Sequence, residues 1–436
     1  MCKEMQSDRH DDERNKAAEI LFKLGQYYEE RDGNLNEAIS CFNDTLQRNN
    51  EHKEAMVAIA RVHQNLGNNE QCSLFCKKVL KLDSKNEEAT YMQANLMLMK
   101  EESEGAIQTY IKLLEAEPDN FKILANLIEL LRRAGRVDEA QKYLDNAETK
   151  TQRSKMAGLA YCKGIFLRFN SDPQKALREL NFSRFDNFYG ESAIQNMIDI
   201  YLNPANEMIF SSILETDYAT TQENIQAAKE LVEELKVRGV DTSIIECQIL
   251  IATKQKANLE QAQKLLKNIL SKNEKYVPGQ VQMGLCNFIL KKSVDARNHL
   301  KVVVKMDYQL QYAEQFEQAW LLMGDYYISV NKYDLAEAEL KKCLKYNKSN
   351  IKAEELMGLI KEKEKAYVDA ADHYAKAWKM SNKKNGGVGF RLGFNYLKAN
   401  RLVDAIDVGK DILKVYPSFP KVQSDIIDKA RTQIRC

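Results

Sequence analysis

The sequence predicts an all-α protein built as a solenoid of stacked helix pairs. Three observations carry this prediction. Small residues recur at steps of 34, large apolar residues surround them at helical spacing, and the 436 residues include only six prolines and 18 glycines. A fixed period of this length is typical of helix-pair repeats, and few helix-breaking residues favour helices throughout.

The period is clearest in one small residue that lies early in the second helix of each predicted pair. The first three steps are 34 residues each, and the later steps are 34, 35, 36 or 40, with one of 86. This is the spacing of tetratricopeptide repeats (TPR), W-x2-L-G-x2-Y…A-x3-F…P. In chain order the position is filled by Ala38, Cys72, Ala106, Ala140, Ala176, Ala262, Ala296, Ala336, Ala370 and Ala405.

The stretch AWLLMGDYYISVNKYDLAEAEL contains Trp320, Gly324, Tyr327, Ala336 and Leu340 in this register. We expect the glycine and the alanine to lie where the two helices approach closely, and the large residues to form the seam between them. One pair cannot bury its apolar stripe alone, so neighbouring pairs must stack. The fold class predicted is a TPR α-solenoid, a right-handed superhelix of about ten to eleven helix pairs with a C-terminal capping helix.

The elements follow in order. Residues 1–16 are charged and are expected to form a disordered N-terminal tail. A TPR array of about five repeats is predicted over 17–184, a divergent helical segment with a loop over 185–240, and a second array of about five repeats over 241–418. Residues 419–436 are predicted to form a capping helix that gives the array a polar end.

The divergent segment corresponds to the long step after Ala176. We expect a helix over Ala193–Tyr201 that ends at Asn203-Pro204, and a second helix over Gln222–Lys236. The loop between them, near 205–221, is interpreted either as a solvated insertion in a divergent repeat or as a binding element.

Composition excludes several classes of function. The formal charge is +1, from 64 basic and 63 acidic side chains, which gives no electrostatic footprint for nucleic acid or for an acidic membrane. Nine scattered cysteines predict free thiols in a reducing compartment. The charged start MCKEMQSDRHDDERNK is unlike a secretory signal, and no apolar run is long enough to cross a bilayer. We therefore expect a cytosolic protein without direct membrane insertion.

Two groups resemble metal or nucleotide sites. Cys72 and Cys76 lie one helical turn apart with His63 in the partner helix, but Cys72 occupies the small packing position and a structural zinc needs a fourth ligand. The segment NGGVGFRLGFNYL lacks the Gly-Lys-Ser/Thr of a phosphate loop. Gly393 is interpreted as the repeat glycine, and Gly386-Gly387 as a loose turn before a helix.

Charged groups on predicted helices are interpreted as solvated faces. Asp369, Asp372 and His373 resemble a catalytic cluster, yet the pattern supplies no pocket that would shift their pKa values. Lys77-Lys78 and Arg132-Arg133 are expected at the surface, with a contact to a partner as the alternative. We assign no catalytic, cofactor-binding or metal-binding residue, we expect no cofactor and no enzyme activity, and the partner-binding residues stay unknown.

One specific binding mode of TPR arrays can be compared with this chain, the clamp that holds a C-terminal carboxylate of a chaperone. Asn95 and Asn126 fit such a clamp, but Tyr91 stands where a lysine belongs, and Gly158 and Cys162 stand where a lysine and an arginine belong. A TPR co-chaperone or adaptor that binds peptide tails of cytosolic proteins is kept as the alternative function.

Four segments resemble the C-terminal part of the tetratricopeptide repeat protein 21 family. These are LIELLRRAGRVDEAQKYL, AYCKGIFLRFNSDPQKALRELN, NMIDIYLNPANE and the long segment Ala371–Val422, and the resemblance covers the chain from about Ala17 onward. It implies a non-catalytic scaffold subunit of intraflagellar-transport complex A, which supports retrograde ciliary transport and cilium assembly. It further implies that the partners are other subunits of that complex and that the protein is found in the cytoplasm and the cilium, at the basal body and axoneme.

Members of the family that this chain resembles are about three times as long as this chain. A fragment, a truncated gene model and a short family member all fit this difference. The cargo and the surface that meets each partner are not implied by the resemblance.

Overall fold

The computed structural model describes residues 2–29, 34–84, 86–99, 103–170, 172–203, 222–419 and 421–435. Within these ranges every regular element is helical and no strand occurs. The predicted all-α class is therefore confirmed. The expected loop near 205–221 lies outside the described residues.

The chain divides into two compact units, Met1–Leu130 and Leu131–Cys436. In the first unit, helices that follow each other in the chain pack together from α1 to α6. Its helices are α1 (Cys2–Tyr27), α2 (Leu35–Arg48), α3 (Lys53–Asn65), α4 (Asn69–Leu82), α5 (Glu87–Met99), α6 (Ser103–Ala116) and most of α7 (Phe121–Arg133), which runs across the boundary.

The second unit continues the same succession of helices. Its longer elements are α8 (Ala140–Lys150), α9 (Met156–Phe169), α10 (Pro173–Ser183), α11 (Gly190–Leu202), α13 (Gln222–Val237), α14 (Ser243–Ala252), α15 (Lys256–Lys272), α16 (Val277–Ile289), α17 (Ser293–Val304), α18 (Ala313–Ser329), α19 (Tyr333–Tyr346), α20 (Ile351–Lys363), α21 (Tyr367–Met380), α22 (Gly386–Lys398) and α23 (Leu402–Val415). Short 3-10 helices cover Val137–Glu139, Arg153–Lys155 and Leu310–Tyr312. The chain ends in a π-helical turn over Gln423–Asp428 and in α24 (Lys429–Arg435).

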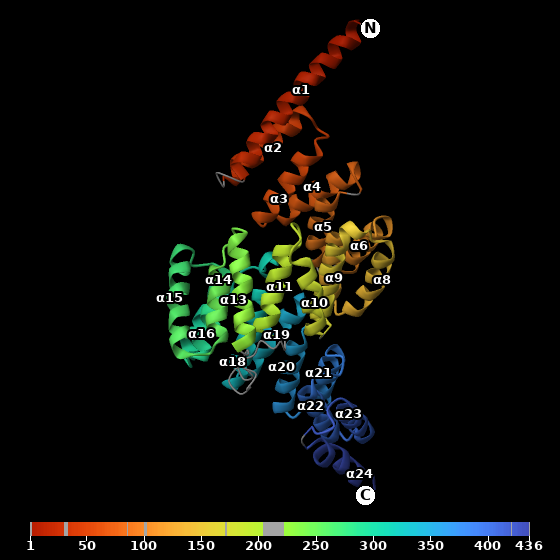
Figure 1. Ribbon diagram of the computed structural model, residues 1–436, viewed down its shortest axis with the longest axis vertical. Coiled ribbons are helices and arrows are strands. Elements are labelled where there is room, and N and C mark those ends of the chain that lie inside the picture. The colour runs from red at the N-terminus through yellow and green to blue at the C-terminus, as the bar shows by residue number, and fades with distance from the viewer. Residues whose placement is uncertain are drawn as a thin grey trace. The chain divides into compact units, whose positions relative to one another are not determined.

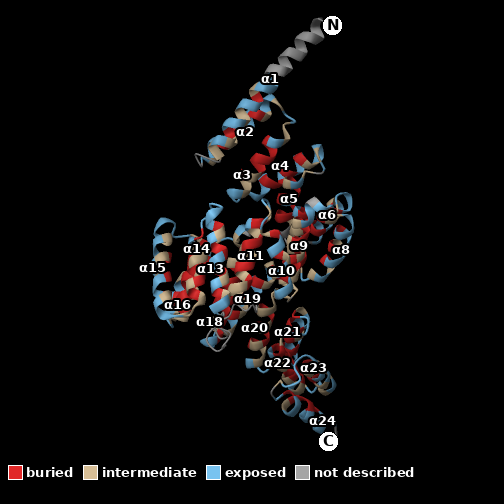
Figure 2. Cartoon of the chain, viewed as in Figure 1, coloured by how far each residue is buried: buried red, intermediate tan, exposed pale blue. Residues whose placement is uncertain are grey.

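Within the second unit, helices adjacent in sequence are adjacent in space. Figure 1 shows α9, α10, α11, α13, α14 and α15 side by side in chain order, and each contacts the next. Buried residues follow the packed sides of these helices, whereas exposed residues face outward (Figure 2). Stacking of neighbours is what an α-solenoid needs, because each pair buries its apolar stripe only against the next pair.

Six of the turns that join the two helices of a pair share one backbone conformation. Five residues before the small position, the backbone adopts a positive φ at Gly67, Gly135, Lys291, Asn331, Lys365 and Asn400. A left-handed residue at this point ends the first helix and lets the chain reverse. Only two of the six are glycine, so the stacked helices hold the other four in a conformation that L-residues disfavour.

Two predicted segments differ from the structure. Helix α1 includes residues 2–16, which were expected to be a disordered tail. The segment has no proline and no glycine before Gly25, and its Glu, Lys, Arg and Met residues have good helix propensity. The divergent segment 185–240 contains α11 and α13, which pack on each other like the helices of other pairs.

Ala228 accounts for this pairing. It is fully buried on α13 and lies 34 residues before Ala262, so it fills the small position that the sequence pattern lost after Ala176. The interruption of the period is thus an insertion between the two helices of one pair. The expected helix ends agree closely with α11 and α13.

Candidate interaction surface

The residues that define the period are packing residues. The ten predicted small positions, from Ala38 to Ala405, all have a relative exposure of 0%. The repeat glycines face a large side chain of the second helix: a Cβ on Gly324 would lie 2.9 Å from Leu340, and one on Gly284 would lie 2.7 Å from Leu300. The motif therefore describes helix contact and provides no chemistry.

The last helix pair, α22 and α23, is packed differently. Sixteen residues after Gly393 the chain has a second glycine, Gly409, so no large side chain of α23 fills the gap. The terminal segment fills it: Ile426 faces Gly393 and Ile427 faces Gly409, with a Cβ on either glycine 2.8 Å from the isoleucine. Both isoleucines are buried. The predicted capping segment thus completes the apolar core of the last pair with Ile426 and Ile427.

The cysteine and histidine group forms no metal site. Cys72 and Cys76 are fully buried with their sulfurs 4.0 Å apart, and His63 stacks on Phe75 with ring centroids 6.2 Å apart. No cluster of three or more potential metal ligands occurs in the part of the chain that the structure describes. Burial raises the pKa of the Cys247 and Cys286 thiols to about 11, so these thiols stay protonated at neutral pH.

The suspected catalytic cluster separates into two environments. Asp369 and Asp372 are exposed, as expected for a solvated face, and Asp372 lies 3.9 Å from Arg401. His373 differs from the expectation, because its Nδ1 lies 2.6 Å from Oε2 of the buried Glu354 on α20. This histidine thus ties α21 to α20 and does not form a group with the two aspartates.

The remaining candidates are also placed by the structure. Lys77 and Lys78 are exposed, as expected. Gly386 and Gly387 form the first turn of α22, capped by the Asn385 side chain, so the expected loose turn is instead a helix start.

Three of the five clamp positions lack the exposure that a carboxylate clamp requires, while Asn126 is half-buried. Asn95 and Cys162 are buried, Gly158 is buried, and Tyr91 is exposed. A buried thiol at the position of a clamp arginine offers no donor to a peptide carboxylate.

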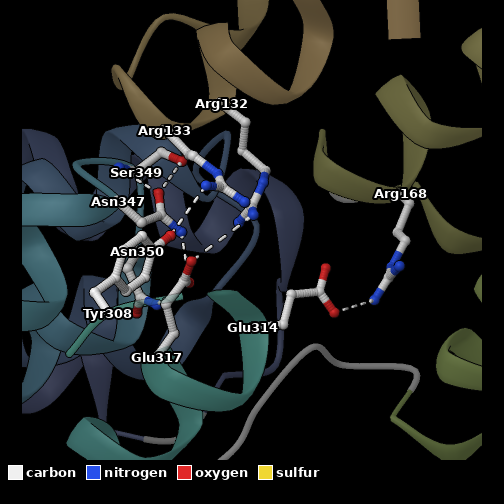
Figure 3. Close-up of polar contacts among 9 residues, drawn as sticks. All are labelled: Arg132, Arg133, Arg168, Tyr308, Glu314, Glu317, Asn347, Ser349 and Asn350. Carbon is white, nitrogen blue, oxygen red and sulfur yellow. Dashed lines mark hydrogen bonds and ion pairs between the residues drawn. The ribbon is translucent and has the colours of Figure 1, made fainter. Parts of the chain in front are cut away.

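Arg132 and Arg133 contradict the expectation of a surface charge pair. The exposed fraction of Arg132 is 8%, its guanidinium lies 4.4 Å from the centroid of the Phe169 ring, and its Nη2 lies 3.8 Å from Oε1 of Glu317, which is 6% exposed. The other oxygen of Glu317 accepts hydrogen bonds from Asn347 at 2.7 Å and from Asn350 at 3.2 Å (Figure 3).

Arg133 extends this contact. Its guanidinium donates to the Tyr308 hydroxyl at 3.0 Å across a sequence separation of 175 residues, and its backbone carbonyl accepts from the amide of Lys348 at 2.8 Å. Farther along, Arg168 lies 3.8 Å from Glu314 (Figure 3). It also lies 3.3 Å from Asp199. Period and spacing carry no information about such contacts, because they join repeats that are far apart in the chain.

Large exposed apolar side chains gather where α10 leads into α11. Phe182, Phe185 and Phe188 are 59%, 69% and 67% exposed. Arg238 braces this turn by donating to the backbone carbonyls of Arg184 and Asp186. Exposed apolar groups of this size often mark protein contacts, which makes this turn a candidate interaction surface.

A small surface hollow lies over α16, between α15 and α17. Its volume is about 280 Å³, below the range usual for small-molecule sites. It is lined by Gln263, Lys267, Met283, Asn287, Lys292, Asp295, Asn298 and His299. Burial lowers the pKa of His299, whose Nδ1 lies 2.7 Å from Gln280, so the ring contributes no charge at neutral pH.

Among the described residues, none of the helices has the length and hydropathy needed to cross a membrane.

Comparison with protein families matches three models along the chain. Residues 227–431 match the tetratricopeptide repeat protein 21 C-terminal ARM domain, and residues 87–202 match the TT21 fifth ARM repeats domain. Residues 53–86 match a tetratricopeptide repeat.

Curated relatives match over nearly the whole chain. The chain is 39% identical to human tetratricopeptide repeat protein 21B in an alignment of 435 positions that covers 96% of this chain and 33% of that protein. It is 34% identical to the 21B protein of Xenopus laevis and 33% identical to human tetratricopeptide repeat protein 21A, each with the same coverage. The chain thus spans about a third of the length of these relatives.

Among solved structures, the chain resembles a chain of the APC/C hetero-tetramer Cut9-Hcn1. The TM-score is 0.36 at 12% identity, with 96% of this chain and 90% of that chain covered.

Proposed function

Because the chain belongs to the tetratricopeptide repeat protein 21 family, we propose that it is a non-catalytic scaffold of intraflagellar-transport complex A that supports retrograde ciliary transport and cilium assembly. One observation carries this proposal, the identity of 39% to human tetratricopeptide repeat protein 21B over 96% of the chain. The repeats themselves indicate protein binding and leave the partner open.

The side chains described above support a role without catalysis. The repeat motif residues are buried in helix contacts, the seven cysteines from Cys41 to Cys343 are buried thiols, and His373 is bound to Glu354. General acid–base or nucleophilic catalysis needs such groups at a pocket with shifted pKa values. A solenoid instead offers long surfaces to other proteins.

The partners proposed are other subunits of complex A, and the location proposed is the cytoplasm and the cilium, at the basal body and axoneme. The chain spans about a third of the length of its relatives. The predicted division into two arrays with a divergent segment between them is proposed as the layout of the binding surfaces.

Affinity purification from a ciliated cell tests the proposal. The tagged chain is expressed, purified gently and analysed by mass spectrometry, with an unrelated TPR array carrying the same tag as the control. We expect the other complex A subunits to be enriched over the control and the tagged chain to be found in cilia by microscopy.

The alternative function gives a different result. A co-chaperone clamp would recover chaperones, and a peptide that ends in a free carboxylate would displace them. Recovery of chaperones alone, or of nothing above the control, would contradict the scaffold role for this chain.

A further inference from the structure

The polar contacts between distant repeats of the second unit form a compact group of their own. One side is the end of α7, with Arg132 and Arg133. The other side is the entrance to α18 and the turn between α19 and α20, with Tyr308, Glu317, Asn347 and Asn350 (Figure 3). We name these six residues the polar clasp. Both of its sides lie within one compact unit.

The α18–α20 side of the clasp has an apolar core of its own. The cluster that contains the apolar neighbours of Glu317 on α18 is built only from residues between Val277 and Ile360. Three contacts reach it from the α7 side: Arg132 pairs with Glu317, Arg133 donates to the Tyr308 hydroxyl, and the carbonyl of Arg133 accepts from the amide of Lys348. Separation of the two sides would therefore break ionic and hydrogen-bond contacts and leave the α18–α20 cluster intact.

The ion pair between Arg132 and Glu317, at the centre of the clasp, is buried. Both Arg132 and Glu317 are less than one-tenth exposed, and Glu317 is held from two directions, by Arg132 on one oxygen and by the two asparagine amides on the other. A buried ion pair contributes little net stability while both partners are present. Loss of one partner leaves a buried charge without compensation and is strongly unfavourable.

The turn that presents the asparagines is held rigidly. Asn347 accepts from the backbone amide and from the hydroxyl of Ser349, and Asn350 caps α20 by accepting from the amide of Ala353. The amide of Lys348, between them, donates to the carbonyl of Arg133. The α19–α20 turn thus offers one backbone donor to the α7 side, the amide of Lys348, while its two asparagine amides hold Glu317 in place for Arg132.

We propose that the polar clasp is a releasable closure of the second unit, which opens while the helix pairs on both sides stay folded. Local coupling along a solenoid allows two distant repeats to part without unfolding those between them. The opened state presents the guanidinium of Arg132 and the carboxylate of Glu317 to solvent or to charged groups of a partner. This inference does not depend on which assembly the chain joins.

Hydrogen–deuterium exchange on the full chain, read by mass spectrometry, tests the clasp directly. The reporter is the peptide that contains Lys348, and peptides from α16 and α23 report on folding elsewhere. We expect Arg132→Met and Glu317→Gln, each alone, to speed exchange at the reporter by at least about tenfold, because each removes the opposite charge from a buried ionic partner. Exchange in α16 and α23 should stay unchanged.

The double variant separates a clasp from a general packing role. Arg132→Met combined with Glu317→Gln leaves no unpaired charge, so exchange at the reporter should be slower than in either single variant. The matched control is Lys361→Met, which breaks an ion pair with Glu337 between adjacent helices and should leave the reporter unchanged.

Three outcomes would overturn the proposal. Unchanged exchange at the reporter in the single variants would show that the contacts do not hold the two sides together. Faster exchange throughout α18–α20 would show that the pair serves the fold of those helices. Additive effects in the double variant would show that the two charges do not act as a pair.

Discussion

At the scale of single residues, the sequence pattern and the structure agree best where space is tightest. The small positions are all fully buried, and the repeat glycines lie against large side chains of the second helix. Only alanine, or cysteine at one position, fits there. The period therefore records a limit on size, which explains why it is visible in a single sequence.

The first prediction follows from this limit. Ala336→Leu adds three carbons at a position with 0% exposure, and we expect overpacking to lower the free energy of unfolding by about 1–3 kcal/mol. The measurement is urea unfolding followed by circular dichroism. Asp372→Ala is the control, because the Asp372 side chain is 63% exposed and its Arg401 partner is 3.9 Å away. A larger loss for Asp372→Ala would show that the register is misplaced.

Residues that act across repeats could not be predicted in this way. Arg132 and Arg133 look like any charged pair on a helix, and the sequence interpretation placed them at the surface. The structure buries Arg132 against Phe169 and Glu317. Partners this far apart in the chain leave no trace in period, spacing or composition, because the array sets their proximity by the sum of many small rotations.

At the scale of elements, the positions of the helices could be predicted better than which helices pair with each other. The helices expected at Ala193–Tyr201 and Gln222–Lys236 correspond to α11 and α13. Their membership of one pair was missed, although the step of 34 residues from Ala228 to Ala262 would have revealed it. A search for the small residue that starts from both ends of an interruption recovers such a pair.

The second prediction belongs to this scale and concerns the terminal segment. Ile426 is fully buried and occupies the space that Gly393 leaves open, so Ile426→Ala should lower the free energy of unfolding of the last pair by about 2–5 kcal/mol. Amide exchange should become faster in α22 and α23 and stay unchanged in α16 and α17. Ile434→Ala is the matched control, since that side chain is 51% exposed.

A segment that only capped the array with polar groups would behave differently. Ile426→Ala would then have no more effect than Ile434→Ala, and the cost of removing residues 421–436 would be small. The packing of Ile426 and Ile427 on two glycines argues for the larger effect.

At the scale of the whole molecule, stability should be distributed along the array. The chain forms two compact units, Met1–Leu130 and Leu131–Cys436, and within each unit successive helix pairs contact each other. In such an array, stability is close to a sum of the stabilities of single repeats and of the contacts between neighbours. A substitution that destabilises one repeat should therefore destabilise only the helices near it.

The last prediction tests this distribution in the first unit. Phe42 is fully buried on α2 and fills the space beside Gly25, so Phe42→Ala should remove about 3–5 kcal/mol from the stability of the surrounding helices. We expect faster amide exchange over α1–α4 and unchanged exchange over α16–α20, with two resolved transitions in urea. A single transition, in which every helix exchanges faster by the same factor, would instead mean that the two units unfold as one cooperative body. The local description of the array, and with it the independent opening of the polar clasp, would then fail together.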